Sequence, residues 1–201
     1  MSGLVIAISR EFGSGGRQVG ERLAQELGVA FYDKALIHLA VAKSGFDPVT
    51  FEKAEEEAAS KFLFNLTIGS CVSAGGFPHV SVPISDQVFF AQTKAIEEIG
   101  ARGGCVVIGR CSTYILRNVP GRLRVFVYGE TKDRLRRIVE EYGVPAREAE
   151  AKMAKMDRAR ANYHQHYTDE AWGAAHSYDL SVNTSHTGVD GAVRVIRALC
   201  C

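Results

Sequence analysis

The stretch "LVIAISREFGSGGRQVGERLAQELG", residues 4–28, decides the fold of this chain. Its first part, "LVIAIS" at 4–9, is an unbroken apolar run, which is typical of a strand buried on both faces. Residues 17–27 repeat apolar side chains at helical spacing, and Gly28 is a typical helix stop. Three glycines stand between these elements: Gly13, Gly15 and Gly16. The order predicts a strand, a tight glycine loop and a helix whose N-terminus meets the loop.

The rest of the chain repeats this alternation of strands and helices. Further strands are predicted at 29–33, 105–109, 124–128 and 178–184. Helices are predicted at about 34–66, from a cap at Ser85-Asp86 to about 102, from a cap at Thr131 to Tyr167 in two parts, and at 189–200. Residues 69–85 have the small-residue composition of a loop. The pattern predicts a single α/β domain in which helices cover both faces of a parallel sheet.

The composition is that of an ordinary globular protein. Of its 201 residues, 46% are hydrophobic and 23% are charged, and the formal net charge is +1. A charge so close to zero gives no sign of a nucleic-acid or membrane partner, and no apolar run approaches the length of a membrane span. The five cysteines form no CxxC pair, which argues against a disulfide framework and a zinc site. Because the N-terminus lacks a signal-peptide pattern, we expect a cytoplasmic protein, with its oligomeric state left open.

The glycine loop has the features of a phosphate-binding site. Glycines let the backbone turn sharply and point N–H groups inward, and a helix N-terminus adds partial positive charge. The P-loop motif GxxxxGK[ST] adds a lysine for the phosphates and a hydroxyl for Mg²⁺. With Gly16 as its last glycine, the chain departs from the motif at Glu11, Arg17 and Gln18. Arg17 offers a permanent charge and planar donors for two phosphate oxygens, whereas the simpler alternative is a plain strand–helix turn.

The metal site is less well defined than the phosphate site. Gln18 is a poor Mg²⁺ ligand, so no metal ligand is certain, and the Ser14 hydroxyl, the Asp33 carboxylate or water would have to hold the ion. Asp33 ends the second strand, where it either orients the acceptor or caps the next helix. Arg10 is expected to form a structural ion pair with Glu11.

Five stretches together carry a resemblance to a known family. They are "ISREFGSGGRQVGERLAQELGVAFYDKALI", "CVVIGRCSTYIL", "RVFVYGETKDRLRRI", "MDRARANYHQHYTDEAW" and "YDLSVNTSHTGVDGAVRVI". Through them the chain resembles the cytidylate kinase-like family, a branch of the P-loop nucleoside monophosphate (NMP) kinases, except over about 45–85. The resemblance implies a three-layer P-loop NTPase fold with a five-stranded parallel sheet. Its core would comprise about 1–33, 103–130 and 176–201, its NMP-binding segment about 34–102, and its small helical lid about 143–175.

The resemblance also implies transfer of the γ-phosphate of ATP to CMP or dCMP, with Mg²⁺ as cofactor. Arg110 matches the arginine that holds the acceptor phosphate in cytidylate kinases; its alternative is an exposed arginine at a helix start. Arg134 and Arg137 share one helix face. The sequence alone predicts that this face is exposed to solvent, whereas the resemblance implies that it contacts ATP. Arg158 and Arg160 lie in the lid segment, where arginines close over the donor phosphates.

The expected site residues fall into four groups. The expected catalytic residues are Arg17, Arg110, Arg158 and Arg160. The ATP phosphates are expected to contact Gly13, Ser14, Gly15, Gly16, Arg17, Gln18, Arg134 and Arg137. The acceptor is expected to contact Asp33 and Arg110, and the adenine is expected near Thr184 and Ser185.

Three functions are compatible with the sequence. The first is an ATP-dependent kinase of an NMP, with nucleotides as its partners. The second is a nucleotide-binding sensor or pseudokinase with little turnover, because Arg17 and Gln18 replace groups that serve the reaction itself. The third is a kinase of a different small-molecule acceptor, since residues 45–85, which should recognise the acceptor, carry no motif. We rank them in this order.

Overall fold

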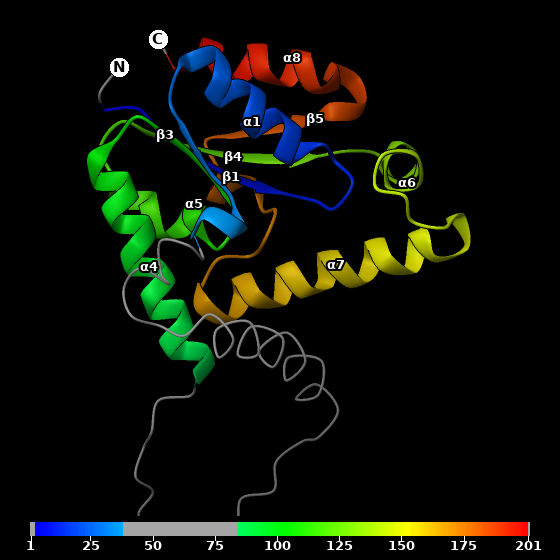
Figure 1. Cartoon of the computed structure of the whole chain (residues 1–201), viewed down its shortest axis with the longest axis horizontal. Coiled ribbons are helices and arrows are strands. Elements are labelled where there is room, and N and C mark those ends of the chain that lie inside the picture. The colour runs from blue at the N-terminus through cyan, green and yellow to red at the C-terminus, as the bar shows by residue number, and fades with distance from the viewer. Residues whose placement is uncertain (1–2, 38–83, 201) are drawn as a thin grey trace, which may run out of the picture.

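The central feature of the structure is a five-stranded parallel sheet between two layers of helices (Figure 1). It is a computed structural model that describes residues 3–37 and 84–200. The strands are β1 (Val5–Arg10), β2 (Ala30–Tyr32), β3 (Cys105–Ile108), β4 (Arg122–Tyr128) and β5 (Leu180–Asn183). Their order is β2-β3-β1-β4-β5, and each neighbouring pair is parallel. The predicted α/β fold with a five-stranded parallel sheet is confirmed.

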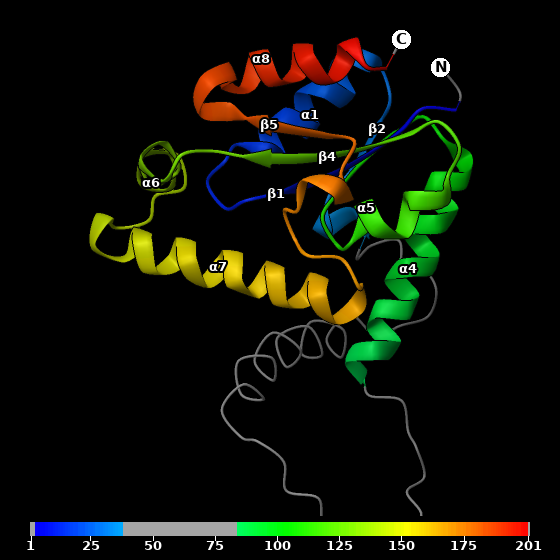
Figure 2. The same cartoon turned by 180° about the vertical axis from the view of Figure 1, so that it is seen from behind.

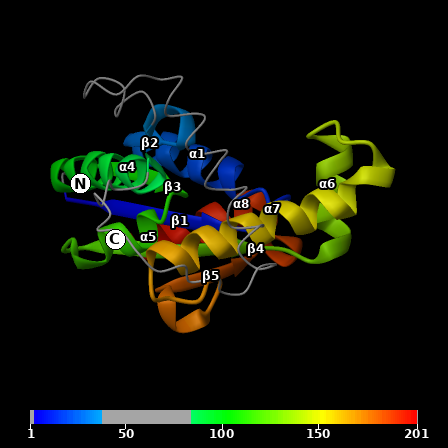
Figure 3. The ribbon, with the colours of Figure 1, turned by 90° about the horizontal axis from the view of Figure 1, so that it is seen from below.

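Helices cover both faces of this sheet, as the opposite views in Figures 1 and 2 show. The helices are α1 (Gly16–Leu27), α4 (Ile84–Arg102), α5 (Ser112–Ile115), α6 (Thr131–Glu140), α7 (Ala146–Tyr167) and α8 (Thr184–Ala198). Two 3-10 turns are η1 (Leu116–Asn118) and η2 (Ala175–Ser177). α1 and α8 lie side by side on one face, α4 and α5 lie on the other, and α7 runs beneath the strands (Figure 3).

The alternating side chains of β1 build the core on both faces of the sheet. Ile6 and Ile8 are fully buried and pack with residues of α1 and α8, including Leu23. Val5 and Ala7 point the other way and pack against α4 and α5. Burial on both faces explains the unbroken apolar run, because a strand with one solvated face would alternate apolar and polar residues. The end of β1, where the glycine loop begins, is thereby fixed at the centre of the molecule.

Several predicted boundaries differ from the observed ones. α8 begins at Thr184 and not at 189, because the Asn183 side chain accepts a hydrogen bond from the Ser185 amide (2.9 Å). Gly188 interrupts this helix with φ 64°, so the regular amphipathic pattern becomes visible only after it. The cap of α6 is Glu130, so the predicted cap at Thr131 is wrong by one residue.

The expected NMP-binding segment is described only in part. α4 is described from Ile84, so Ser85 and Asp86 lie within its first turn and not before the helix. Residues 34–37 form a helical turn after β2, in agreement with the start of the predicted helix. The rest of that helix and most of the expected loop at 69–85 lie outside the described residues. Within the described ranges, none of the helices combines the length and apolar character needed to cross a membrane.

One buried hydroxyl connects the glycine loop to the far side of the sheet. Thr184, at the start of α8, is 5% exposed. Its Oγ1 donates to the carbonyl oxygen of Ser14 in the loop (2.7 Å) and also lies 3.0 Å from that of Tyr128 at the end of β4. Because a hydroxyl has one proton, the two carbonyls share this donor. The loop is thus held by a residue 170 positions away in the sequence.

Replacing Thr184 by valine should destabilise the protein without changing the shape of the side chain. The carbonyls of Ser14 and Tyr128 would lose their shared donor, so we expect the free energy of unfolding in urea to fall by about 1–3 kcal/mol. Thr131→Val makes the same change at an exposed threonine, and we expect it to alter the unfolding free energy by about 0.5 kcal/mol or less. Equal losses in the two variants would contradict the assigned role of Thr184.

Candidate functional site

The glycine loop between β1 and α1 depends on glycine at two positions. Gly13 and Gly15 have φ values of 80° and 75°, in the left-handed region that side chains other than glycine rarely adopt. A Cβ atom at Gly13 would also lie 2.8 Å from the carbonyl oxygen of Arg134. Gly15 is the N-cap of α1 and has no side chain to accept hydrogen bonds from the first helical turn. The Gly16 amide lies 3.4 Å from the Ser14 hydroxyl, and the amides after it have no side-chain acceptor at the cap, which suits this end of the helix to an anion.

Two arginines of α6 support the loop. Arg134 is 6% exposed; its Nε donates to the carbonyl oxygen of Phe12 (2.8 Å), and its Nη atoms form ion pairs with Glu11 (3.1 Å) and with Asp157 of α7. Asp157 in turn accepts a hydrogen bond from the Phe12 amide (2.7 Å). Arg137 donates to the carbonyl oxygen of Gly13 (2.7 Å). Both arginines reach the loop, where these donors are directed to backbone oxygens, so the contacts shape the loop.

The two residues at the apparent lysine and hydroxyl positions of the motif point to carboxylates. Arg17 has a 60% exposed side chain and pairs with Asp33 (3.0 Å) and Glu21 (3.2 Å). Gln18 donates to Glu141 (2.7 Å). Asp33 also accepts a hydrogen bond from the Leu36 amide (3.2 Å), so it caps the helical turn at 34–37.

Asp33 is stabilised as a carboxylate. Partial burial alone would raise its pKa, but the Leu36 amide and the Arg17 guanidinium outweigh that effect and hold the pKa below its ordinary value. Asp33 therefore stays negatively charged near neutral pH and keeps Arg17 on its side of α1.

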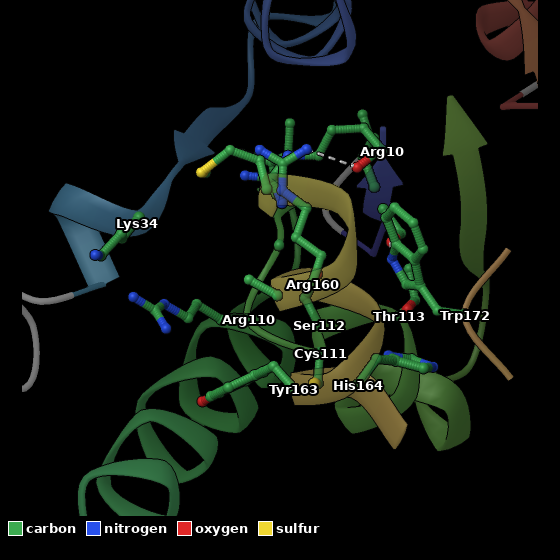
Figure 4. Close-up of a pocket in the computed structure, with 16 residues that line it drawn as sticks. Arg10, Lys34, Arg110, Cys111, Ser112, Thr113, Arg160, Tyr163, His164 and Trp172 are labelled. Carbon is green, nitrogen blue, oxygen red and sulfur yellow. Dashed lines mark hydrogen bonds between the residues drawn. The ribbon is translucent and has the colours of Figure 1, made fainter. Parts of the chain in front are cut away.

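A cavity of about 510 Å³ opens at the carboxyl ends of β1 and β3, next to the glycine loop (Figure 4). Four basic side chains line it: Arg10, Lys34, Arg110 and Arg160. None of the described aspartates or glutamates is among its lining residues. The carboxyl edge of a parallel sheet is where ligands bind in open α/β folds. The position and charge of the cavity suit an anionic ligand.

Arg110 enters this cavity from a strained turn. Arg110 and the following Cys111 have φ values of 53° and 54°, which is unusual for residues with a side chain and typically costs about 1–3 kcal/mol each. The guanidinium lies 5.6 Å from the ring centroid of Tyr163 in α7. Such strain is often retained where a side chain must be aimed at a ligand.

Arg160 enters from α7 on the opposite wall. Its Nη1 donates to the carbonyl oxygen of Arg10 (3.0 Å), shown as the dashed line in Figure 4. Its guanidinium also lies 5.6 Å from the ring centroid of Phe12 in the loop. Burial lowers the pKa of Arg160, although the nearby Asp157 opposes that effect. Arg158 is exposed on the same helix and is not among the residues that line the cavity.

Arg10 is a lining residue whose position the sequence did not predict. Glu11 pairs with Arg134, so the expected ion pair between Arg10 and Glu11 is not formed. Among the described residues, no acceptor lies within hydrogen-bond distance of the Arg10 guanidinium. Burial, and then the positive charges of Arg160 and Arg110, lower its pKa to about 9. The Asp33 carboxylate opposes this lowering but does not cancel it.

The remaining wall of the cavity combines apolar side chains, such as Ile8 and Met156, with polar groups that carry no acidic charge. His164 is 3% exposed, its Nε2 has no partner among the described residues, and burial lowers its pKa although Glu170 opposes this. Trp172 donates from Nε1 to the Ser9 hydroxyl (3.0 Å), which fixes its ring at the cavity rim. Ser112 and Thr113 complete this side. In the sequence, His164 stands between Tyr163 and Tyr167 in a helical stretch and belongs to no motif that marks a ligand site.

The other predicted residues lie around the loop. Ser14 is fully buried, and its hydroxyl donates to the carbonyl oxygen of Glu11 (2.9 Å). Ser185 accepts a hydrogen bond from the Glu130 amide (2.8 Å), close to the buried Thr184.

In the described part of the chain, no group of three or more His, Cys, Asp or Glu side chains is placed to hold a metal ion.

Comparison with known proteins agrees with this architecture. Among solved structures, an uncharacterized protein from Eubacterium ventriosum is 25% identical, with a TM-score of 0.71 and 98% of each chain covered. A gluconokinase from Sinorhizobium meliloti is 17% identical, with a TM-score of 0.53 and coverage of 99% of this chain and 92% of that one. A shikimate kinase from Bacteroides thetaiotaomicron is 13% identical, with a TM-score of 0.50 and coverage of 98% and 97%. No curated protein matches the chain significantly.

These likenesses confirm the predicted P-loop kinase fold. The sequence profile of the cytidylate kinase-like family matches residues 5–186, a range that contains the glycine loop and all five strands. The predicted resemblance is therefore confirmed, and this chain belongs to the cytidylate kinase-like family.

Proposed function

We propose that this protein transfers the γ-phosphate of ATP to an NMP, with CMP or dCMP as the preferred acceptor. The observation that supports this most is the basic cavity beside the glycine loop, which has four cationic side chains and no described carboxylate in its lining. Phosphoryl transfer requires two anions to be held in line and their charge to be neutralised. Membership of a kinase family supports ATP as the donor.

The glycine loop would bind the phosphates of the donor. The amides at the start of α1 have no acceptor within the helix, and the helix dipole favours negative charge at this end. Arg134 and Arg137 would act by holding the loop in shape, and Arg160 would neutralise charge from the lid side. Arg158, exposed on α7, would contact the donor only through movement of the lid segment.

Mg²⁺ fits this site as an ion held mainly by phosphate oxygens and water. The Ser14 hydroxyl is engaged by Glu11 and the Gly16 amide, which makes Ser14 a poor direct ligand. Asp33 remains charged and is suited to contact the ion through water. When bound, Mg²⁺ would neutralise part of the phosphate charge.

The acceptor would occupy the cavity. Arg110, held by a left-handed turn at the end of β3, would bind the acceptor phosphate, with Lys34 on the same side in Figure 4. The neutral wall at His164 and Trp172 lies opposite and offers hydrogen bonds and an aromatic face to the base or sugar. The segments 34–102 and 143–175 would act as NMP-binding segment and lid.

Two other functions use the same cavity. The replacement of the motif lysine and hydroxyl favours a nucleotide-binding sensor or pseudokinase with little turnover. The positive charge of the cavity would also accept a different anionic small molecule, which favours a kinase of another acceptor. Both alternatives keep ATP at the glycine loop, and they differ from the leading proposal only in the step after ATP has bound.

The proposed activity is tested by coupling ADP release to a spectrophotometric assay with CMP, dCMP, UMP and AMP in turn. We expect Mg²⁺-dependent ADP release with CMP or dCMP above the rate with ATP alone. Thermal stabilisation by ATP is measured in parallel, because a ligand that binds the native state raises its stability. Stabilisation without turnover on any of the four would contradict transfer to an NMP and favour the sensor or the kinase of a different acceptor.

Replacing Arg110 by methionine tests the acceptor assignment. Methionine keeps a long unbranched stem at this strained position but removes the charge. We expect the KM for the acceptor nucleotide to rise by about tenfold or more, since a hydrogen bond to a charged group contributes about 1.5–3 kcal/mol. The KM for ATP should change by less than about threefold.

Arg117→Met is the matched control for this variant. Arg117 also lies over a tyrosine ring, that of Tyr114 at 3.7 Å, but it does not line the cavity. We expect both KM values to stay at the level of the unmodified protein. An Arg110→Met variant that raises only the KM for ATP would show that Arg110 serves the donor.

A further inference from the structure

The GxxxxGK[ST] motif can be aligned with this chain in two ways. If Gly16 is the last glycine, Arg17 takes the lysine position. If Gly15 is the last glycine, Gly16 takes the lysine position and Arg10 takes that of the first glycine. The sequence alone favours the first alignment, because it places a basic residue where the motif has one.

The backbone favours the second alignment. Gly15 is the N-cap of α1 and has φ 75°, so it is the position at which the turn requires glycine. Its carbonyl accepts the first helical hydrogen bond, from the Val19 amide (3.0 Å). Gly16 is the first residue of the helix, and Arg17 directs its guanidinium to Asp33 and Glu21. Of the two candidate lysine positions, 16 therefore has no side chain and 17 has a guanidinium that is directed away to carboxylates. The helix α1 thus supplies no cation in the place of the motif lysine.

The side chain of Arg10 occupies the space that a side chain at position 16 would need. A Cβ atom built on Gly16 would lie 2.6 Å from Cβ and 3.0 Å from Cγ of Arg10. Contacts below 3.0 Å are essentially never seen for real Cβ atoms, so side chains at positions 10 and 16 exclude each other. In the second alignment the motif has glycine at position 10 and lysine at position 16, whereas this chain has arginine at position 10 and glycine at position 16.

The stem of the Arg10 side chain lies against the loop at Gly16, and its guanidinium lies at the end of β3, in the lining of the cavity beside the loop. A Cβ atom on Gly109 would overlap it, with 3.1 Å to Cζ, so the guanidinium lies directly against the backbone at the end of β3. Arg10 is among the lining residues of the cavity, and its own carbonyl accepts the hydrogen bond from Arg160. In the described part of the chain, no carboxylate forms an ion pair with it. Its charge is thus available to an anion at the loop.

We propose that Arg10 binds the β- and γ-phosphate oxygens of ATP and supplies the positive charge that lysine supplies in the P-loop motif, a role that rests on the proposed ATP-dependent function. A guanidinium holds two oxygens through donors fixed in one plane, whereas an ammonium acts as a compact point charge with rotatable donors. Arg17 then keeps its partner Asp33 in place near the start of the NMP-binding segment. Glycine at position 16 leaves room for the stem of Arg10, and Gly109, whose φ of 80° itself favours glycine, leaves room for the guanidinium.

Titration calorimetry with ATP and Mg²⁺, without acceptor, tests this role independently of turnover. We expect Arg10→Met to raise the Kd for ATP by about tenfold or more and Arg10→Lys to raise it less. Gly16→Lys alone should also weaken binding, because the lysine would collide with Arg10. The double variant Arg10→Gly, Gly16→Lys restores the glycine and the lysine of the motif and should bring the Kd back to within about threefold of the starting value.

Arg22→Gln is the control, since Arg22 is an exposed arginine of the same helix that pairs with Asp190. It should leave the Kd unchanged. Arg17→Gln tests the other alignment directly, and we expect it to raise the Kd less than Arg10→Met does. Thermal unfolding of each variant establishes that it is folded, and the double variant keeps the test valid if Gly16→Lys fails to fold.

Three results would overturn the role of Arg10. One is a Kd for ATP that Arg10→Met leaves unchanged while Arg17→Gln raises it. Another is an Arg10→Met variant that weakens binding of CMP but not of ATP, which would assign Arg10 to the acceptor. If the unmodified protein itself binds no ATP, the proposed function fails together with this role, whereas the first two results leave that function standing.

Discussion

A single buried guanidinium, that of Arg134, joins three segments that are distant in the sequence. It contacts Glu11 and Phe12 in the glycine loop from its own helix α6, and Asp157 on α7. Breaking a buried pair of this kind typically costs about 3–5 kcal/mol, because the remaining carboxylates lose their counter-charge in a place with little water. The conformation of the loop and the distance between loop and α7 both depend on this one side chain.

The helix α7 consequently belongs to both halves of the site. Asp157 supports the loop, and Arg160, three residues later on the same helix, bonds to the Arg10 carbonyl and lines the cavity. Tyr163, a further turn along, lies under Arg110. One helix therefore contacts both the groups proposed to bind the donor and the group proposed to bind the acceptor. If two substrates must be aligned for a reaction, residues on one shared helix would fix their relative positions more accurately than residues on two independent elements.

Local signals in the sequence predicted the fold and the loop, whereas long-range contacts decided the roles of individual arginines. The strand β1 and the glycines were recognisable because apolar runs and glycines restrict the backbone directly. The start of α8 was missed because its cap, Asn183, lies before a glycine interruption that hides the pattern. Arg10 was misjudged because Glu11, its expected partner, pairs with Arg134, which is close only after folding. Most of the predicted acceptor segment lies outside the described residues.

The mutual exclusion of side chains at positions 10 and 16 restricts how this loop can have arisen. Two single substitutions separate a glycine–lysine pair from an arginine–glycine pair. A chain with arginine at position 10 and lysine at position 16 would place two long side chains in one space, whereas a chain with glycine at both positions would avoid the conflict. The second chain would hold an anion through the loop amides and the remaining cations of the cavity, Lys34, Arg110 and Arg160.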